Sequence, residues 1–324
     1  MLLVLTNSED ATADYLQSRL CESSVPFIRI NTDSVIDQSE LSYQPKEPLL
    51  HIGRRWHKPH DFSNVWYRRP EKLKSVNIPE SPEGRSVLDE WTESLEGFLA
   101  HIPRRRWMNH PAANALASRK LEQLSTAARL GLPIPDTILT QDPEELKRFF
   151  EKHSGEVVAK PLGKAYIQRS ENEADSLIYT NQITAADLDN LSDLADCPTL
   201  FQRCIRKASD LRITFVDGEM HAAELIAKDS NGQQRCDIRR NNMEDVQYRC
   251  VTLPARMSSK LRKLVSFYGL RFAAIDVVIG IDGEWHFLEV NPNGQWAWMD
   301  LQGGSSIYKS FVSAFRPSRS RKLQ

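Results

Sequence analysis

Short apolar runs separated by polar turns recur along the chain, and this pattern predicts a mixed α/β protein. Leu2–Leu5 and Phe27–Ile30 are typical of buried strands, and the segment between them predicts a helix through Leu20, capped by Ser8 or Asp10. A strand, a helix and a strand at this spacing indicate a parallel βαβ unit. The same pattern predicts strands at Leu49–Ile52 and Asn64–Tyr67 and an amphipathic helix over Ser86–His101.

A polar break at Asn109-His110-Pro111 ends this first part near residue 108. Apolar spacing then predicts one helix over Asn114–Leu130, closed by Gly131. Leu200-Phe201-Gln202 is expected to open a last part, so we divide the chain into 1–108, 109–196 and 197–324. Between these limits the pattern predicts strands at Thr137–Thr140, Val157–Lys160 and Ile178–Thr180, helices at Asp142–Lys152 and Thr184–Leu194, and a mobile polar stretch at Gln168–Asp175.

The last part reads as two hairpins separated by a helix. The first pairs Leu211–Val216 with Met220–Ala227 across Asp217-Gly218, and the helix covers Ser258–Tyr268. The second hairpin, Phe272–Asn291, has Asp282-Gly283 between two apolar runs, which is the strongest short hairpin signal. The basic tail after Phe315 is expected to fray.

The second hairpin brings acidic side chains together in an apolar setting. If Asp282-Gly283 is a two-residue turn, counting outward places Asp276 directly opposite Glu289, with Cβ atoms about 5 Å apart. Asn291 lies two residues beyond Glu289 and points to the same face. Leaving two buried carboxylates unpaired costs several kcal/mol, so a positive partner is expected. The oxygen donors Asp276, Glu289 and Asn291 suit Mg²⁺ shared with phosphates, while a nearby arginine or a solvated strand end are the alternatives.

The composition mainly excludes certain partners, metal sites and targeting segments. The chain has 324 residues, 40% of them hydrophobic and 26% charged, with a net charge of −1, so nothing favours nucleic acid or a membrane as a partner. The five cysteines are scattered without zinc-ligand spacing and suit a reducing, cytoplasmic location. The start lacks a signal-peptide pattern, and no run reaches the about 18 apolar residues of a membrane span.

Basic residues supply further candidate chemistry. Lys160 ends the strand Val-Val-Ala-Lys and is expected to project into a cleft, which Lys120 on its helix could share. Two lysines and a magnesium site are what a triphosphate needs, because phosphoryl transfer depends on positioning and charge neutralisation. Neither a Walker loop nor a dinucleotide-binding glycine motif is present. For each lysine, a solvated surface position is the alternative.

Two arginines and one strand end complete the candidate residues. Arg212 shares a strand face with Asp210, and Arg239 lies in the polar stretch CDIRRNN. Arginine suits the charge that develops on an acyl phosphate, although a surface position is the alternative for each. The strand end Gln202, Arg203, Cys204 and Ile205 could read an adenine edge through its backbone.

Taken in order, these residues resemble the ATP-grasp fold: a helix lysine, a strand lysine, a hinge, Asp210-x-Arg212, then Asp276 and Glu289-x-Asn291. Within that fold, the segments FLEVNPNGQW, Ser118-Arg119-Lys120 before GLPIP, and VWYRRP look like the graspetide maturases, the microviridin-type ribosomal-peptide ligases. The resemblance implies an α/β (α+β) architecture with an amino-terminal Rossmann-like pre-ATP-grasp domain, a central lid and a carboxy-terminal catalytic domain.

The resemblance also implies a reaction. ATP would phosphorylate an Asp or Glu side chain of a precursor peptide, and a Thr or Ser hydroxyl or a Lys amine of that peptide would displace the phosphate to close a macrolactone or macrolactam. The roles implied are ATP binding for Lys120, Lys160, Gln202 to Ile205 and Asp210, Mg²⁺ binding for Asp276, Glu289 and Asn291, and acyl-phosphate contacts for Arg212 and Arg239. The partner is then a precursor peptide with a leader and an acidic core containing Thr, Ser or Lys, and a homodimer is one assembly open to the enzyme.

Two alternatives use the same residues. A ligase similar to the ribosomal-protein glutamate ligases would add free amino acids to a carboxylate, and a nucleotide-binding regulator would keep the fold without catalysis. The sequence Asp237-Ile238-Arg239 departs from the family pattern, which often has Trp in place of Ile, and this departure concerns packing on the substrate and not the arginine.

Overall fold

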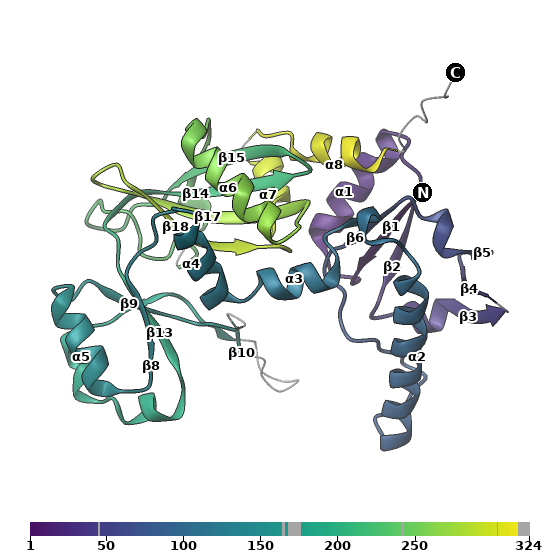
Figure 1. Cartoon of the computed structure of the whole chain (residues 1–324), viewed down its shortest axis with the longest axis horizontal. Helices are drawn as coiled ribbons and strands as arrows, with labels where there is room; N and C mark the ends of the chain where they lie inside the picture. Colours follow the sequence, from purple (N-terminus) through teal and green to yellow (C-terminus); the bar gives the residue numbers. More distant parts are fainter. Residues whose placement is uncertain (45, 164–165, 168–175, 241–242, 303, 317–324) are drawn as a thin grey trace.

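The computed structural model describes residues 1–324 except 45, 164–165, 168–175, 241–242, 303 and 317–324. In Figure 1 the amino-terminal part lies on the right, the large sheet with its helices lies at the upper left, and the smaller lobe lies below the large sheet. The predicted α/β class is confirmed. The predicted mobile stretch at 168–175 lies outside the described residues, as does the basic tail apart from Arg316.

The amino-terminal part is built on a parallel sheet in the order β2-β1-β6-β7. Helix α1 connects β1 to β2, which confirms the βαβ unit, and Asp10 caps this helix by accepting a bond from the Ala13 N–H. The strand predicted at Leu49–Ile52 belongs to a separate antiparallel sheet, β3-β4-β5. The elements are β1 Leu2–Thr6, α1 Ala11–Glu22, β2 Phe27–Asn31, β3 Ser39–Gln44, β4 Glu47–Ile52, β5 Arg55–His57, β6 Asn64–Tyr67, α2 Pro82–Ala100 and β7 Trp107–Met108.

The smaller lobe has an antiparallel sheet in the order β12-β9-β13-β8, covered by α5. Because β13 pairs with both β8 and β9, the strand predicted to open the last part is a member of this sheet. The predicted strand at Ile178–Thr180 is absent there, and short strands flank it instead. The elements are β8 Thr137–Thr140, α5 Pro143–Lys152, β9 Val157–Lys160, β10 Tyr166–Ile167, β11 Ser176–Leu177, β12 Asn181–Gln182 and β13 Thr199–Arg203.

The helix predicted over Thr184–Leu194 is wrong in type. The segment forms two 3₁₀ turns, Ala185–Asp189 and Ser192–Asp196. Thr184 does begin the first turn, where its hydroxyl and N–H both donate to the Asp187 carboxylate at 2.7 Å. Asp and Asn side chains compete with the helical backbone for hydrogen bonds, and this segment is rich in them, so a continuous α-helix is disfavoured.

The large sheet is antiparallel in the order β16-β15-β14-β17-β18, with both predicted hairpins in place. Its residues alternate between two faces. One face, with Ile213 and Ile275, packs on helix α6 and on helix α4 (Lys120–Arg129), and the other carries Arg212 and Asp276. The elements are β14 Lys207–Val216, β15 Glu219–Ile226, β16 Gln247–Val251, α6 Ala255–Phe267, β17 Phe272–Gly280, β18 Trp285–Asn291, α7 Ala297–Leu301 and α8 Ile307–Phe315.

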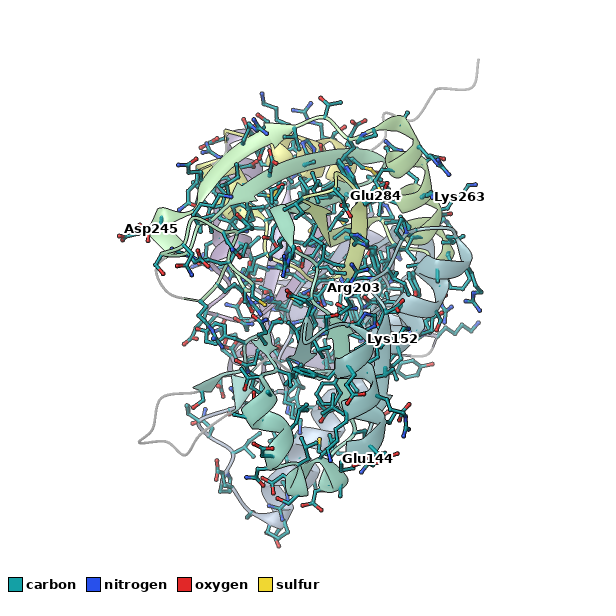
Figure 2. All side chains as sticks on the ribbon, turned by 90° about the vertical axis from the view of Figure 1, so that its left-hand side faces the viewer. Glu144, Lys152, Arg203, Asp245, Lys263 and Glu284 are labelled. Carbon is teal, nitrogen blue, oxygen red and sulfur yellow. The ribbon has the colours of Figure 1, made fainter. Side chains whose placement is uncertain are left out.

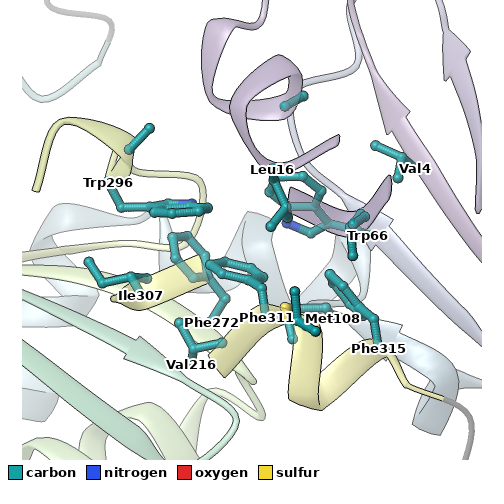
Figure 3. Close-up of a cluster of buried hydrophobic side chains, with 14 of the residues drawn as sticks. Val4, Leu16, Trp66, Met108, Val216, Phe272, Trp296, Ile307, Phe311 and Phe315 are labelled. Carbon is teal, nitrogen blue, oxygen red and sulfur yellow. The ribbon is translucent and has the colours of Figure 1, made fainter. Parts of the chain in front are cut away.

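A single hydrophobic core joins the amino-terminal part to the end of the chain (Figure 3). Trp66 of β6 packs on Phe311 of α8 at 5.4 Å between ring centroids, and Trp296 stacks on the same phenylalanine at 4.7 Å. Phe272 of the large sheet also contacts Phe311. Helix α8 therefore fixes the amino-terminal part against the large sheet.

The helix predicted over Asn114–Leu130 is two helices, α3 Pro111–Ala117 and α4 Lys120–Arg129. At the break, the Ser118 hydroxyl donates back to the Asn114 carbonyl at 2.7 Å, and Arg119 adopts an extended conformation. Serine side chains that bond to the backbone in this way compete with a continuing helix. The break makes Lys120 the first residue of α4.

Candidate active site

A cavity of about 740 Å³ lies between the smaller lobe and the large sheet. Its walls include every residue predicted from the sequence to bind nucleotide, metal or acyl phosphate: Lys120, Lys160, Gln202, Arg203, Cys204, Ile205, Asp210, Arg212, Arg239, Asp276, Glu289 and Asn291. They come from helix α4, both sheets and the loops between them. The fold thus gathers the predicted set at one site.

Asp276 faces Glu289 as predicted, although the hairpin reaches this register by a different route. Gly280, and not Ile281, pairs with Glu284, so the turn has three residues and the two-residue turn is wrong. Gly283 has a φ of +82°, which only glycine adopts readily in such a turn. An irregularity at Leu288 then restores the register before Glu289. The two departures cancel.

In this structure the cationic partners of the two carboxylates are side chains of the protein. The Nη1 atom of Arg212 donates to both oxygens of Asp276 at 2.8 and 3.0 Å, and Lys120 Nζ lies 3.4 Å from Glu289 Oε2. The Asn291 amide oxygen accepts a bond from the Asn293 N–H at 2.9 Å. The arginine alternative raised by the sequence is therefore realised at Asp276.

The same oxygen donors also fit a shared Mg²⁺ ion. No group of three or more His, Cys, Asp and Glu side chains able to hold a metal occurs in the described part of the chain. The Asp276 and Glu289 side chains remain 32% and 36% exposed, so both can be reached from the cavity. Two carboxylates with one amide oxygen suit Mg²⁺ that takes its remaining ligands from phosphates and water. The donor set does not suit a metal held by protein ligands alone.

Two lysines face these carboxylates from different elements. Gln123 fixes α4 on the sheet because its side-chain amide bonds to both the N–H and the carbonyl of Val290 in β18, each at 2.9 Å. Lys120, one turn earlier, donates to the Pro161 carbonyl at 2.7 Å. Lys160 donates to the Gln202 side chain at 2.6 Å, and burial lowers the pKa of Lys160 even though Glu289 opposes the shift.

Residues 202–205 form the hinge between the smaller lobe and the large sheet. Figure 2 places Arg203 between Lys152 of the lobe and Glu284 of the large sheet. The N–H groups of Arg203 and Cys204 donate to the Asp136 and Glu156 carbonyls, both at 2.8 Å, so these two groups hold the hinge in place. Sequence reasoning did not anticipate this use of the hinge backbone.

The remaining predicted residues are bound in ion pairs. Asp210 accepts bonds from Lys207 at 2.6 Å and Gln234 at 2.9 Å, and burial raises the pKa of Asp210. Arg239 makes two bonds to Asp237, at 2.9 and 2.6 Å, and these bonds raise the pKa of Arg239. Lys207, which the sequence analysis missed, thus lies inside the site.

The arginine pair that follows β6 was also missed. The buried Arg68 side chain lies 3.3 Å from Asp10 and donates to the Gly294 carbonyl at 3.1 Å and the Gln295 side chain at 2.6 Å. The next residue, Arg69, lines the cavity and has no side-chain hydrogen bond or ion pair with any residue the structure describes. Both follow the carboxyl end of a parallel strand, which is a usual place for binding residues. This position in the sequence could have identified them as candidate site residues.

Residues 122–291, more than half of the chain, match the family described as the prokaryotic glutathione synthetase ATP-grasp domain. No curated protein matches the chain. Within the part that the structure describes, no helix combines the length and apolar character needed to cross a bilayer.

Solved structures similar to nearly the whole chain include enzymes from two bacteria. The macrocyclase MdnC bound with precursor peptide MdnA, from Microcystis aeruginosa MRC, is 26% identical with a TM-score of 0.80, over 97% of this chain and 98% of that chain. The Chryseobacterium gregarium RiPP-associated ATP-grasp ligase, in complex with ADP and a leader and core peptide, is 26% identical with a TM-score of 0.84, over 97% and 96%. The macrocyclase MdnB of the same Microcystis strain is 27% identical with a TM-score of 0.77, over 97% and 98%. The resemblance read from the sequence is confirmed: the chain belongs to the ATP-grasp domain family of the prokaryotic glutathione synthetases and is an ATP-dependent ligase of the graspetide-maturase type.

Proposed function

We propose that this ligase closes macrolactone or macrolactam rings in a ribosomal precursor peptide. The observation that carries the proposal is the cavity in which Lys120 and Lys160 face Asp276 and Glu289, with Arg69 entering from the amino-terminal part. Support also comes from the Microcystis and Chryseobacterium enzymes, which are similar over nearly the whole chain and were solved with peptides bound.

In the proposed reaction, Lys120 and Lys160 bind the phosphates of ATP. Asp276, Glu289 and Asn291 would hold Mg²⁺, which would neutralise phosphate charge. The terminal phosphoryl group passes to an Asp or Glu side chain of the peptide, releasing ADP and leaving an acyl phosphate. A Thr or Ser hydroxyl or a Lys amine of the same peptide then attacks the acyl carbon. The carbon–oxygen bond to phosphate breaks, and an ester or amide forms. The chain's own contribution is positioning and charge, as is usual for phosphoryl transfer.

The arginines differ in their availability to substrate. Arg212 and Arg239 are each bonded to a carboxylate of the protein, Asp276 and Asp237 respectively. We assign them to the acyl phosphate, whose charge would lie next to these pairs. Arg69 has no such partner among the described residues, so we assign it to the incoming carboxylate of the peptide core, which arginine binds in a bidentate manner.

The test is incubation of the enzyme with ATP, Mg²⁺ and a short peptide encoded beside its gene, rich in Thr or Ser and in Asp or Glu near its carboxy terminus. Loss of one water molecule per crosslink, measured by mass spectrometry, is the expected result. A gain of amino-acid residues would instead support a reaction of the glutamate-ligase kind. ATP binding without any product from such peptides would support a nucleotide-binding regulator.

A further inference from the structure

One end of the cavity has apolar walls that the proposed reaction does not use. It is lined by Leu225, Ile238, Tyr248 and Trp298, which we call the aromatic end of the cavity. The rings of Tyr248 and Trp298 lie 5.0 Å apart between centroids. Leu225 is buried, and the other three side chains are partly buried against the small core to which it belongs. The packing holds the two rings in place and leaves part of each open to the cavity.

The order of strands separates the aromatic end from the hinge. Tyr248 lies on the edge strand β16, and Glu289 lies on the opposite edge strand, β18. Neighbouring strands lie about 4.8 Å apart, so four spacings put the two edges roughly 19 Å apart. The hinge adjoins the β18 edge, because the Phe287 N–H donates to the Pro133 carbonyl at 2.8 Å, in the segment on which the hinge is bonded. A ligand seated at the hinge therefore leaves the aromatic end open.

The aromatic end adjoins the arginines assigned to the acyl phosphate. Ile238 directly precedes Arg239 in the loop before β16. Trp298 lies in α7, next to the loop whose backbone carbonyl holds Arg212 at 2.9 Å. On the sheet, Tyr248 lies two strands and two residues from Arg212, roughly 12 Å between Cα atoms. Two residues of an extended peptide advance about 7 Å, and their side chains cover the rest of this distance.

The aromatic pair also carries two hydrogen-bond donors that the protein leaves unused. Neither the Tyr248 hydroxyl nor the Trp298 indole N–H makes a hydrogen bond with any residue that the structure describes. Tyrosine and tryptophan in partly buried positions usually give these groups a partner. Apolar walls with a few polar groups are the usual form of a binding pocket. The aromatic end therefore suits an apolar side chain with peptide carbonyl groups beside it.

We propose that the aromatic end binds a large apolar side chain of the precursor peptide, aromatic or branched aliphatic, within two positions of the activated Asp or Glu. Tyr248 and Trp298 contact that side chain, and their donors bond to carbonyl groups of the peptide. The proposal rests on the proposed function and adds to it a rule for choosing among the acids of the peptide: the carboxylate with the apolar neighbour reacts first.

The experiment uses the full chain with ATP, Mg²⁺ and the peptide encoded beside its gene. The residues within two positions of one ring-forming acid are changed in turn to Phe or to Ser. We expect kcat/KM for water loss at that acid to be at least about tenfold higher with Phe than with Ser at one of these positions. Fluorescence anisotropy of the labelled peptides, with ADP and Mg²⁺ present, measures the same preference as an affinity, without turnover.

Variants of the protein locate the preference. Tyr248→Ala, Trp298→Ala and Ile238→Ala should each reduce it to less than about threefold while the KM for ATP stays unchanged. Ile238 lies in a loop and Tyr248 on an edge strand, so these two variants decide the matter if Trp298→Ala does not fold. Tyr43→Ala is the matched control, at an exposed tyrosine of β3 outside the cavity.

Equal rates and affinities for the Phe and Ser peptides would overturn the proposal. A preference that survives in both Tyr248→Ala and Ile238→Ala would overturn it as well, because the apolar side chain would then bind elsewhere. A preference in binding that depends on Tyr248, without any ring closure, would support the aromatic end and count against the proposed function.

Discussion

Arg212 and Asp276 lie directly opposite each other on β14 and β17, and one guanidinium nitrogen bonds to both carboxylate oxygens. The other terminal nitrogen, Nη2, donates to the Gln295 carbonyl at 2.9 Å. The arginine is therefore held by the sheet on one side and by the loop after β18 on the other. A residue assigned to the metal and one assigned to the acyl phosphate share a single hydrogen-bonded unit.

Gly294 gives that arginine its space. A Cβ atom at this position would lie 2.6 Å from Arg212 Nη2 and 2.3 Å from the Ala274 Cβ. We expect Gly294→Ala to displace the guanidinium, to lower kcat at least about tenfold and to cost about 1–3 kcal/mol of stability. Steady-state kinetics and urea unfolding measure the two effects. Gly97→Ala is the matched control, since its Cβ would meet nothing within 4 Å on helix α2, and unchanged kinetics in Gly294→Ala would refute the packing argument.

Glu289→Gln keeps the shape of the side chain and removes its charge. We expect ATP turnover to fall at least about a hundredfold, because the carboxylate is assigned to Mg²⁺. Its ion pair with Lys120 is partly exposed, so stability should change by less than about 1 kcal/mol. Mg²⁺-dependent ADP release is the measurement, with Glu284→Gln in the turn as control. ADP release at the wild-type rate would remove Glu289 from the metal site.

Arg69→Ala tests the contact with the substrate carboxylate. We expect the KM for the precursor peptide to rise about tenfold or more, with the KM for ATP unchanged, because the side chain has no partner among the described residues that would hold the fold. Arg69→Lys should recover only part of the loss, since lysine cannot bind a carboxylate in a bidentate manner. Arg85→Ala on α2 is the matched surface control. A peptide KM equal to that of the wild type would exclude the assignment.

Asn109 joins the amino-terminal part to the large sheet through a fully used amide. Its nitrogen donates to the Phe272 and Pro292 carbonyls at 2.8 and 3.0 Å, and its oxygen accepts from the N–H groups of Arg271 and Phe272. Asn109→Asp would replace the donor group with an acceptor facing two carbonyls, in a buried position. We expect a loss of about 3 kcal/mol in urea unfolding.

The control for this substitution is Asn231→Asp, at an exposed position that does not line the cavity. It should change stability by less than about 0.5 kcal/mol. Equal effects of the two substitutions would show that the amide of Asn109 does not hold the junction.

Lys160 predicts a pH dependence. Burial lowers the pKa of Lys160 below its ordinary value of 10.5, so the charged form is disfavoured in the folded protein. As pH rises from the folded-state pKa toward 10.5, the unfolded chain keeps a proton that the native protein has lost, and stability rises. The free energy of unfolding of the wild type should therefore increase with pH relative to Lys160→Met. Urea titrations between pH 7 and about 10 measure the difference, and a decrease with pH would contradict the shift.

The sequence predicted which residues lie together in the site better than it predicted the local backbone geometry that brings them together. Strand periodicity and Asp282-Gly283 placed Asp276 opposite Glu289, because side chains alternate with a period of two. The same dipeptide also suits a three-residue turn, so the turn type and the compensating irregularity at Leu288 did not follow from it. The break before Lys120 was missed because apolar spacing continues across Ser118, where a local hydrogen bond ends the helix.

Contacts between segments far apart in the chain could not be predicted from local sequence patterns. Arg68 bonds to the loop 293–295, more than two hundred residues away along the chain, and no spacing rule connects the two. The cationic partners of the two carboxylates could not be predicted either, since a metal ion, an arginine and a lysine would each compensate the buried negative charge. The order of motifs along the chain narrowed the choice to a nucleotide site.

The core around Phe311 has a mechanical consequence. The amino-terminal part and the large sheet share that core, whereas the smaller lobe has its own around Phe149 and Phe201. The amino-terminal part and the large sheet thus form one rigid unit, which carries Arg69, Lys120 and the two carboxylates. The smaller lobe is a second unit and carries Lys160. Closure of the smaller lobe would change the reach of Lys160 to the phosphates, while the spacing between Arg69 and the two carboxylates would stay constant.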